Sequence, residues 1–212
     1  MIITVDGPAA AGKGELTQRL AEHFDYARLD TGRLYRAVGL AVLAAGGDPE
    51  DEAAAVTAAG ALSADDLEAP ALRTEEAAGA ASKVAAIPAV RDALIEFQRS
   101  FAATPPGGLQ GAVFDGRDTG TVVIPDAAVK LFLTAGPEAR AERRVKQLHE
   151  QGTEAIHGRV LQEMKDRDAR DTSRKVAPLK PAEDALVIDT TNMDADAVFA
   201  AALDFISRQA AG

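Results

Sequence analysis

A glycine-rich loop between a short apolar run and a helical pattern constrains this chain more than any other feature. The β-branched run Ile2–Val5 predicts a buried strand, and apolar residues at four-residue spacing predict a helix over 12–24. Between them, residues 7–13 read GPAAAGK, which fits G-x-x-x-x-G-K. Backbone N–H groups of such a loop surround an anion at a helix N-terminus, and its lysine reaches the outer phosphates. The pattern predicts phosphate binding by Gly7, Pro8, Ala9, Ala10, Ala11, Gly12 and Lys13.

The loop departs from the usual pattern just after its lysine. A Ser or Thr hydroxyl for Mg²⁺ is expected there, and Gly14 stands in its place. Lys-Gly followed by Thr or Ser is typical of nucleoside monophosphate kinases, but the next residue here is Glu15. The alternative, a glycine-rich turn with a surface lysine, is disfavoured because the motif lies in the first strand–turn–helix.

The rest of the chain alternates short apolar runs with helical segments. Further strands are expected at 26–30, 111–115, 129–133 and 185–189, and helices at 32–45, 137–150, 154–170 and 194–209. This order predicts an α/β fold, a doubly wound parallel sheet of about five strands with helices on both faces, of the P-loop NTPase type. We expect a single domain over 1–212, with a helical acceptor-binding insert at about 48–104 and a lid at about 140–170.

Composition excludes several classes of function. The chain of 212 residues has no Cys and three His, which excludes disulfides and thiolate metal sites, and no residue is predicted as a direct metal ligand. A net charge of −10 disfavours nucleic-acid binding. No apolar run reaches the roughly 18 residues of a membrane span. Without a basic leader at its start, the chain is expected in the cytoplasm.

Arginines gather on two predicted helices that a short segment around residue 152 connects. The spacing of the second set places its members on one helical face, and the two helices together resemble a flap that closes over phosphates. A solvated surface with an i,i+4 pair between Arg167 and Asp171 is the alternative. The residues are Arg140, Arg143 and Arg144 on the first helix, and Arg167, Arg170, Asp171 and Arg174 on the second.

Two further arginines stand near predicted strand ends. Arg36 follows the run DTGRLY at 30–35, and Arg117 is followed by Asp118 directly after a strand. Because ligands bind beyond the carboxyl ends of parallel strands, these side chains are candidates for substrate contact. A turn with a surface salt bridge is the other interpretation of Arg117 and Asp118.

Together these motifs resemble bacterial cytidylate kinases (CMP kinases) over nearly the whole chain. The stretches that carry the resemblance are DGPAAAGKG at 6–14, LDTGRLYR at 29–36, RTEEAAGAASKVAAIPAVRDAL at 73–94, DGRDTGTVVIPDAAVKLFL at 115–133 and RDARDTSRKVAPLKPAEDALVIDT at 167–190. The resemblance implies transfer of the γ-phosphate of ATP to CMP or dCMP by a monomer. It also implies Mg²⁺ held by ATP phosphates, waters and a carboxylate, for which Asp6 and Asp115 are candidates.

The resemblance also implies roles for single residues. Lys13, Arg117 and Arg174 would serve catalysis. The ATP phosphates would be held by residues 7–15, which add Gly14 and Glu15 to the loop motif. The acceptor's phosphate would be held by Arg36, Arg117 and Arg174, its base would lie near Thr31, Arg73 and Asp118, and its ribose near Arg167 and Asp171. The lid would present Arg140, Arg143, Arg144 and Arg170.

The chain departs from the family in one more place. A small antiparallel sheet usually precedes the Arg-Thr-x-Glu stretch, whereas only Leu62–Leu72 stands there, without an alternating pattern. Because that sheet helps to enclose the base, cytosine selectivity is less firmly implied than the reaction. Two alternatives stay open: a P-loop nucleotide-binding protein with weak or lost kinase activity, and a small-molecule kinase of the same fold with another acceptor.

Overall fold

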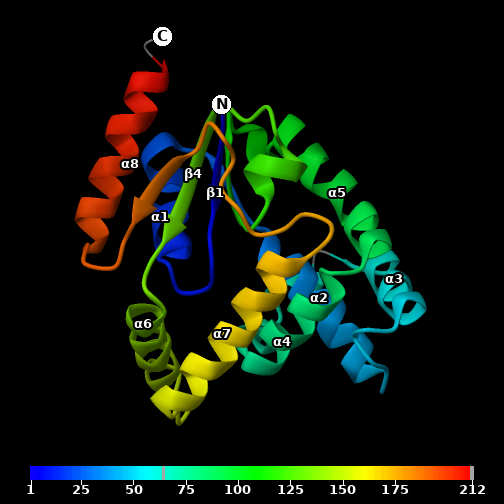
Figure 1. Ribbon diagram of the computed structural model, residues 1–212. Helices are drawn as coiled ribbons and strands as arrows, with labels where there is room; N and C mark the ends of the chain where they lie inside the picture. Colours follow the sequence, from blue (N-terminus) through cyan, green and yellow to red (C-terminus); the bar gives the residue numbers. More distant parts are fainter. Residues whose placement is uncertain (64, 211–212) are drawn as a thin grey trace. The chain divides into compact units, whose positions relative to one another are not determined.

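The fold is an α/β arrangement around a five-stranded sheet, and the computed structural model describes residues 1–63 and 65–210 (Figure 1). The strands are β1 (Ile2–Asp6), β2 (Ala27–Asp30), β3 (Ala112–Gly116), β4 (Val129–Thr134) and β5 (Leu186–Asp189). The α-helices are α1 (Lys13–Phe24), α2 (Thr31–Ala44), α3 (Glu52–Gly60), α4 (Glu75–Val84), α5 (Pro88–Ala103), α6 (Pro137–Glu150), α7 (His157–Ser173) and α8 (Ala195–Ala210). Short helical turns are η1 (Asp65–Glu68), η2 (Pro70–Arg73), η3 (Pro106–Gly108) and η4 (Thr119–Val123).

The sheet has the strand order β2-β3-β1-β4-β5. Strand β1 pairs in parallel with β3 on one side and with β4 on the other, and β4 pairs in parallel with β5. The central strands β1, β3 and β4 are almost continuously buried, as parallel strands covered by helices must be. The predicted α/β fold with a parallel sheet of about five strands is therefore confirmed.

The chain divides into two compact units. The first contains Met1–Leu29 and Pro105–Gly212, and the second contains Asp30–Thr104. In the first unit, buried residues of β1, β3, β4 and β5 form a core with α1 and α8, exemplified by Ile3, Leu20, Leu131 and Ala202. The carboxyl end of β1 leads directly into the glycine-rich loop.

The second unit is helical and is built on small residues. Helices α2 and α4 approach so closely at Gly39 that an added Cβ would lie 2.7 Å from the Cβ of Ala80. Its core includes Leu34, Val38 and Leu94. The unit begins at Asp30, upstream of the predicted insert at 48–104, and the division into one domain with an insert and a lid stays a prediction.

Helices α6 and α7 carry a small core of their own in the first unit. Ala141 and Leu148 of α6 pack against Val160 and Met164 of α7. Ala9 and Ala10 of the glycine-rich loop also pack against this cluster, so the helix pair contacts the loop directly.

Several boundaries differ from the sequence-based expectations. Helix α7 begins at His157 rather than near 154, and it continues to Ser173. Between Leu62 and Leu72, the described residues form the turns η1 and η2, in agreement with the expected lack of strands there. The expected helices at 32–45, 137–150 and 194–209 are present within one or two residues at each end.

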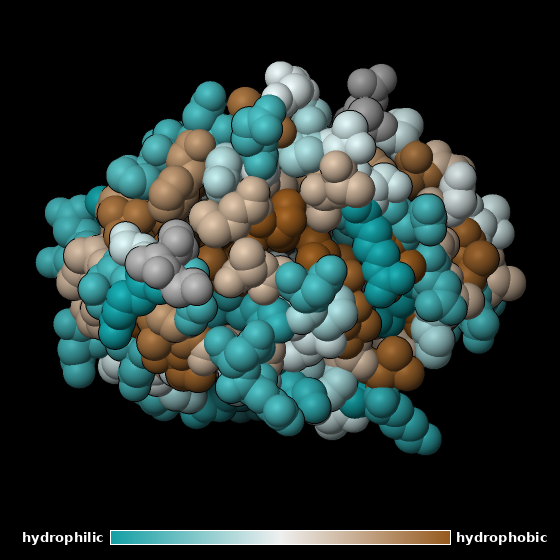
Figure 2. Space-filling model, turned by 90° about the horizontal axis from the view of Figure 1, so that it is seen from above, coloured by the Kyte–Doolittle hydropathy of each residue, from teal (hydrophilic) through white to brown (hydrophobic). Residues whose placement is uncertain are grey.

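Surface residues are mixed in polarity. Figure 2 shows hydrophilic and hydrophobic residues interspersed on the face seen from above. Large apolar side chains that are exposed include those of Ile156, Val187 and Phe97. Among the helices of the described residues, none has the length and apolar character needed to cross a membrane.

Candidate active site

The glycine-rich loop has the backbone geometry of an anion-binding turn. Gly7 has a φ of 144°, and an added Cβ there would lie 2.0 Å from the carbonyl oxygen of Leu133. Ala10 adopts the left-handed region with a φ of 58°, which is uncommon for a residue with a side chain. Gly12, with a φ of 95°, caps the start of α1. The loop thus turns back upon the N-terminus of α1, where N–H groups and the helix dipole favour a phosphate.

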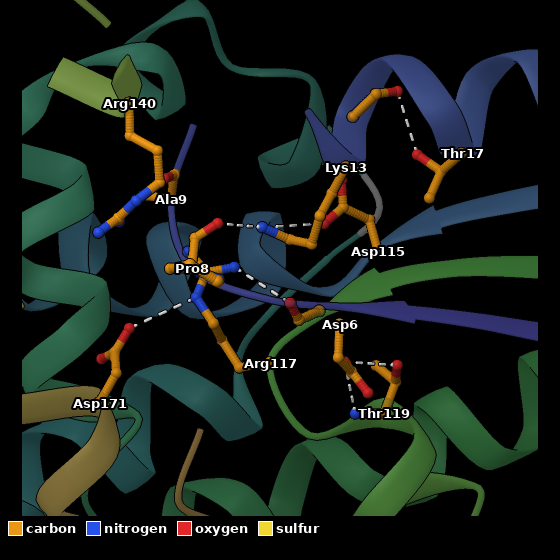
Figure 3. Close-up of polar contacts among 12 residues, drawn as sticks. Asp6, Pro8, Ala9, Lys13, Thr17, Asp115, Arg117, Thr119, Arg140 and Asp171 are labelled. Atoms are coloured by element: carbon orange, nitrogen blue, oxygen red, sulfur yellow. Dashed lines mark hydrogen bonds and ion pairs between the residues drawn. The ribbon is translucent and has the colours of Figure 1, made fainter. Parts of the chain in front are cut away.

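Lys13 lies inside this loop, as predicted. Its residue is 6% exposed, and its ammonium group donates to the carbonyl oxygen of Pro8 at 2.8 Å (Figure 3). The same nitrogen lies 4.0 Å from Oδ1 of Asp115, at the end of β3. These contacts hold the ammonium group of Lys13 at the place where ATP phosphates are expected.

Arg28 was missed by the sequence analysis, although it lies beside the loop. From β2, its Nε donates to the hydroxyl of Thr17 at 2.9 Å, and its terminal nitrogen lies 3.9 Å from Oδ2 of Asp115. Gly14 lies beside this pair, since a Cβ added there would be in ordinary contact, at 3.7 Å, with the terminal nitrogen of Arg28 and with Oδ2 of Asp115. Asp115 therefore lies between two cations. Only the alternation of exposed Arg28 with buried neighbours in its strand could have singled it out.

Glu15, which replaces the expected hydroxyl, is exposed on the first turn of α1. An acidic side chain at a helix N-terminus interacts favourably with the helix dipole. The hydroxyl nearest in sequence is that of Thr17, but it is buried and donates to the carbonyl oxygen of Gly14 at 3.1 Å.

Asp6 does not fit the expected role of an outer ligand for Mg²⁺. It accepts hydrogen bonds from the backbone N–H and hydroxyl of Thr119 and from the N–H of Gly120. Burial raises the pKa of Asp6 to about 6, although these hydrogen bonds favour the charged form. Both of its oxygens are therefore engaged within the protein, and Asp115 is the better candidate of the two.

Asp171 gathers three of the predicted arginines. Its buried carboxylate lies 2.5 Å from a terminal nitrogen of Arg174, and its other oxygen lies 3.4 Å from Nε of Arg117 and 3.9 Å from Nε of Arg167. Arg117 also donates to the carbonyl oxygen of Gly116 at 3.1 Å. Three guanidinium groups around one carboxylate leave an excess of positive charge, which suits a phosphate ligand.

The second arginine set does not share a single face as expected. Arg170 is exposed, whereas Asp171 is buried, and Arg174 follows the last residue of α7 as its C-cap with an extended backbone. Arg167 contacts Asp171 from within α7, whereas Arg174 does so from the point where the chain leaves the helix. Asp118, the predicted neighbour of the base, is buried at the start of η4.

Arg140 is bound within the protein. Only 5% of its side chain is exposed, and it donates to the carbonyl oxygens of Ala135 at 2.9 Å and Ala9 at 3.3 Å. Its other terminal nitrogen lies 2.6 Å from Asp168 of α7. Arg140 thus connects the glycine-rich loop to α7, and Figure 3 shows it beside Ala9 of that loop.

Arg143 and Arg144 differ from each other in their surroundings. Arg143 donates to the hydroxyl of Thr190 at 3.0 Å and to the carbonyl of the same residue at 2.5 Å. The hydroxyl of Thr190 in turn contacts the carbonyl oxygen of Ala11 at 3.0 Å. Arg144 is half-buried and donates to Gln147 of the next helical turn at 3.4 Å. The lid role of these arginines stays a prediction.

The second unit holds the remaining predicted residues. Thr31 is buried at the first position of α2, Arg36 is half-buried one turn later, and Arg73 is exposed at the end of η2. The sequence analysis missed three buried polar side chains of this unit, Ser82, Arg91 and Gln98. Arg91 lies over the ring of Tyr35, the neighbour of Arg36, with 5.7 Å between the guanidinium carbon and the ring centre.

A parallel α/β sheet with a phosphate loop after its first strand, and a separate group of arginines around Asp171, defines a P-loop kinase. Residues 3–208 match the family model of cytidylate kinase. The chain belongs to the cytidylate kinase family.

Cytidylate kinases of other bacteria match this chain over nearly the whole length of both proteins. The chain is 62% identical over 205 residues to the cytidylate kinase of Paramagnetospirillum magneticum, with 97% of each chain covered. It is 52% identical over 209 residues to that of Rhodospirillum rubrum, with 99% of this chain and 98% of the relative covered. It is 54% identical to that of Granulibacter bethesdensis, with the same coverage.

A solved structure of an uncharacterized protein from Eubacterium ventriosum has a similar fold. The TM-score is 0.56, the identity is 14%, and 98% of each chain is covered. At this identity the likeness concerns the fold alone.

Proposed function

We propose that this chain transfers the γ-phosphate of ATP to CMP or dCMP, which yields ADP and CDP or dCDP. The observation that carries the proposal is the cluster of Arg117, Arg167 and Arg174 around Asp171 in the unit that also holds the phosphate loop. A donor loop alone is compatible with many NTP-binding proteins, whereas a separate group of arginines provides a second anion site for the acceptor's phosphate.

The proposed reaction needs no nucleophile from the protein. An oxygen of the CMP phosphate attacks the γ-phosphorus, the bond from that phosphorus to the β–γ bridging oxygen breaks, and ADP leaves. Lys13 neutralises negative charge on the donor phosphates, and Arg117 and Arg174 orient the acceptor. Catalysis then consists of positioning and of stabilising the charge that is spread over the transferred group.

Mg²⁺ belongs to this proposal as the partner of ATP. Among the described residues, no group of three His, Cys, Asp or Glu side chains is arranged to hold a metal ion. The single carboxylate of Asp115, at the phosphate loop beside Lys13, suits an ion held mainly by phosphate oxygens and water. When bound, Mg²⁺ neutralises the phosphates; Asp115 would orient its water shell.

The alternatives are less well supported. A nucleotide-binding protein that has lost catalysis was suggested by Glu15, but that side chain is exposed and Lys13 keeps its place in the loop. Selectivity for cytosine, through Thr31, Arg73 and Asp118, remains part of the proposal, as do the lid, a monomeric state and a cytoplasmic location.

A substrate panel tests the proposal. The rate of ADP release would be measured with MgATP and each of CMP, dCMP, UMP and AMP as the acceptor, with Lys13→Met as the inactive control. We expect turnover with CMP and dCMP at least about tenfold above that with UMP or AMP. ATP binding without transfer to any of the four would instead support lost catalysis, and transfer to AMP or UMP alone would support another acceptor.

A further inference from the structure

The loop that carries Arg117 and Asp118 leads into the single helical turn η4. The first N–H groups of a helical turn lack partners within it, and the side chain of the N-cap residue normally accepts from them. Asp118 occupies the N-cap position of η4, but its side chain makes no capping hydrogen bond. Another acceptor must therefore serve these N–H groups.

Asp6, at the end of β1, supplies that acceptor from a distant part of the sequence. Its Oδ1 accepts from the N–H of Thr119 at 2.9 Å and from the hydroxyl of the same residue at 2.7 Å (Figure 3). Its Oδ2 accepts from the N–H of Gly120 at 2.8 Å. A buried carboxylate with both oxygens engaged by two consecutive residues fixes their backbone in position as well as in orientation.

The turn is also pressed against β1. An added Cβ at Gly120 would lie 2.8 Å from the hydroxyl oxygen of Thr4 and 3.4 Å from Oδ2 of Asp6. Thr4 itself donates to the carbonyl oxygen of Val129 at 3.4 Å. The start of η4 therefore has little room to shift while the Asp6 contacts are present.

We propose that Asp6 is a positioning residue for the acceptor: by capping η4 in place of Asp118, it fixes the loop of Arg117 and Asp118 at the carboxyl end of β1. The inference rests on the proposed function, because it assumes that this loop receives CMP. Asp6 immediately precedes Gly7, the first residue of the phosphate loop. The same strand end therefore determines where both the donor loop and the acceptor loop begin.

Steady-state kinetics of Asp6→Asn test the inference. In this variant an amide N–H₂ faces a backbone N–H, so at least one of the capping bonds is lost. We expect the KM for CMP at saturating MgATP to rise about tenfold or more. The Kd of ATP, measured by calorimetry without CMP, should stay within about twofold of the wild-type value, since the donor loop keeps its own contacts.

A second pair of variants covers the case in which Asp6→Asn does not fold. Thr119→Val removes only the hydroxyl bond to Asp6, and Thr119→Ser retains that bond. The KM for CMP should rise about threefold or more in the Val variant and return to within about twofold of wild type in the Ser variant.

Thr4→Ser provides the matched control. It removes a buried methyl group from the same strand, two residues before Asp6, and keeps both the hydroxyl beside Gly120 and the cap of η4 in place. It should lower the melting temperature without raising the KM for CMP. An unchanged KM in Asp6→Asn and Thr119→Val, or an equal rise in the KM for CMP and the Kd of ATP, would overturn the inference. Wild-type protein that does not turn over CMP would instead overturn the proposed function, and the inference with it.

Discussion

The guanidinium group of Arg174 donates to Oδ1 of Asp171 at 2.5 Å, from a residue that lies just beyond the end of α7. Only 6% of the Arg174 side chain and 3% of the Asp171 side chain are exposed. The carboxylate therefore holds the arginine in one orientation before any acceptor binds. Such preorganisation lowers the cost of binding a phosphate, because the side chain need not be ordered then.

Replacement of Arg174 should impair acceptor use and leave ATP binding intact. Arg174→Ala removes a charge-assisted contact that is proposed for the acceptor's phosphate, so we expect kcat/KM for CMP to fall about a hundredfold. The Kd of ATP should change by less than about twofold. Arg159→Ala is the matched control, because Arg159 is an exposed arginine of α7, paired with Glu163. Wild-type kcat/KM in Arg174→Ala would remove Arg174 from the site.

Glu15→Thr should improve the use of ATP. The exposed carboxylate of Glu15 stands on the first turn of α1, close in sequence to the phosphate loop, where its charge would repel the phosphates of a bound nucleotide. We expect the KM for MgATP at fixed CMP to fall roughly threefold in this variant. Glu22→Thr, an exposed position of the same helix farther from the loop, should leave it unchanged. A clear fall in kcat/KM for Glu15→Thr would show that the carboxylate supports the bound nucleotide.

Two arginines of α6 should respond differently to substitution: loss of Arg140 should lower stability, and loss of Arg144 should lower turnover. Arg140→Ala breaks the buried pair with Asp168 and the contact with Ala9, so the free energy of unfolding should fall by about 3 kcal/mol. Arg144→Ala, at a half-buried position, should lower turnover with less than about 0.5 kcal/mol of effect on stability. Urea denaturation and initial rates on both variants measure the two effects. Equal stabilities would contradict a structural role for Arg140.

The raised pKa of Asp6 predicts a pH dependence of stability. Burial, and to a smaller extent the charge of Asp118, raise that pKa from 3.8 to about 6. A carboxyl group whose pKa is higher in the folded state adds stability at low pH and loses that contribution as the pH rises through about 6. The nearby Lys130 of β4 directs its ammonium group to Asp184 instead.

Asp6→Asn removes this titration. Relative to the variant, the wild type should gain about 1.4 kcal/mol of unfolding free energy when the pH falls from about 7.5 to about 5. Denaturation curves of both proteins at the two pH values measure the difference. A difference that is independent of pH would mean that Asp6 titrates as it does in an unfolded chain.

The sequence predicts features that depend on local pattern, and these agree with the structure. The strand–loop–helix around Lys13 follows from a β-branched run, glycines and apolar spacing within 24 residues of sequence. Arg167 and Asp171 also converge because i,i+4 positions share a helical face. In these cases neighbours in sequence remain neighbours in space.

Features that depend on distant contacts were not predictable in the same way. Asp6 and Thr119 are 113 positions apart, and no spacing rule relates the end of one strand to the turn after another. Helical spacing grouped Arg140 with Arg144 as lid residues. The burial of Arg140 against Ala9 and Asp168, however, depends on how α6 packs in three dimensions. Arg28 was missed because nothing in its own strand indicates that Asp115 lies across from it.

The close approach of Gly7 to β4 limits which amino acids can occupy position 7. Any side chain there would meet the backbone carbonyl of Leu133 at 2.0 Å, and a backbone atom cannot rotate away as a side chain can. Gly46 also has a positive φ, of 74°, but no atom lies within 4 Å of its added Cβ. Asn can replace glycine at such an open position, since it tolerates left-handed backbone. Gly46 can therefore be replaced during evolution, whereas only glycine fits at position 7 while the loop lies against β4.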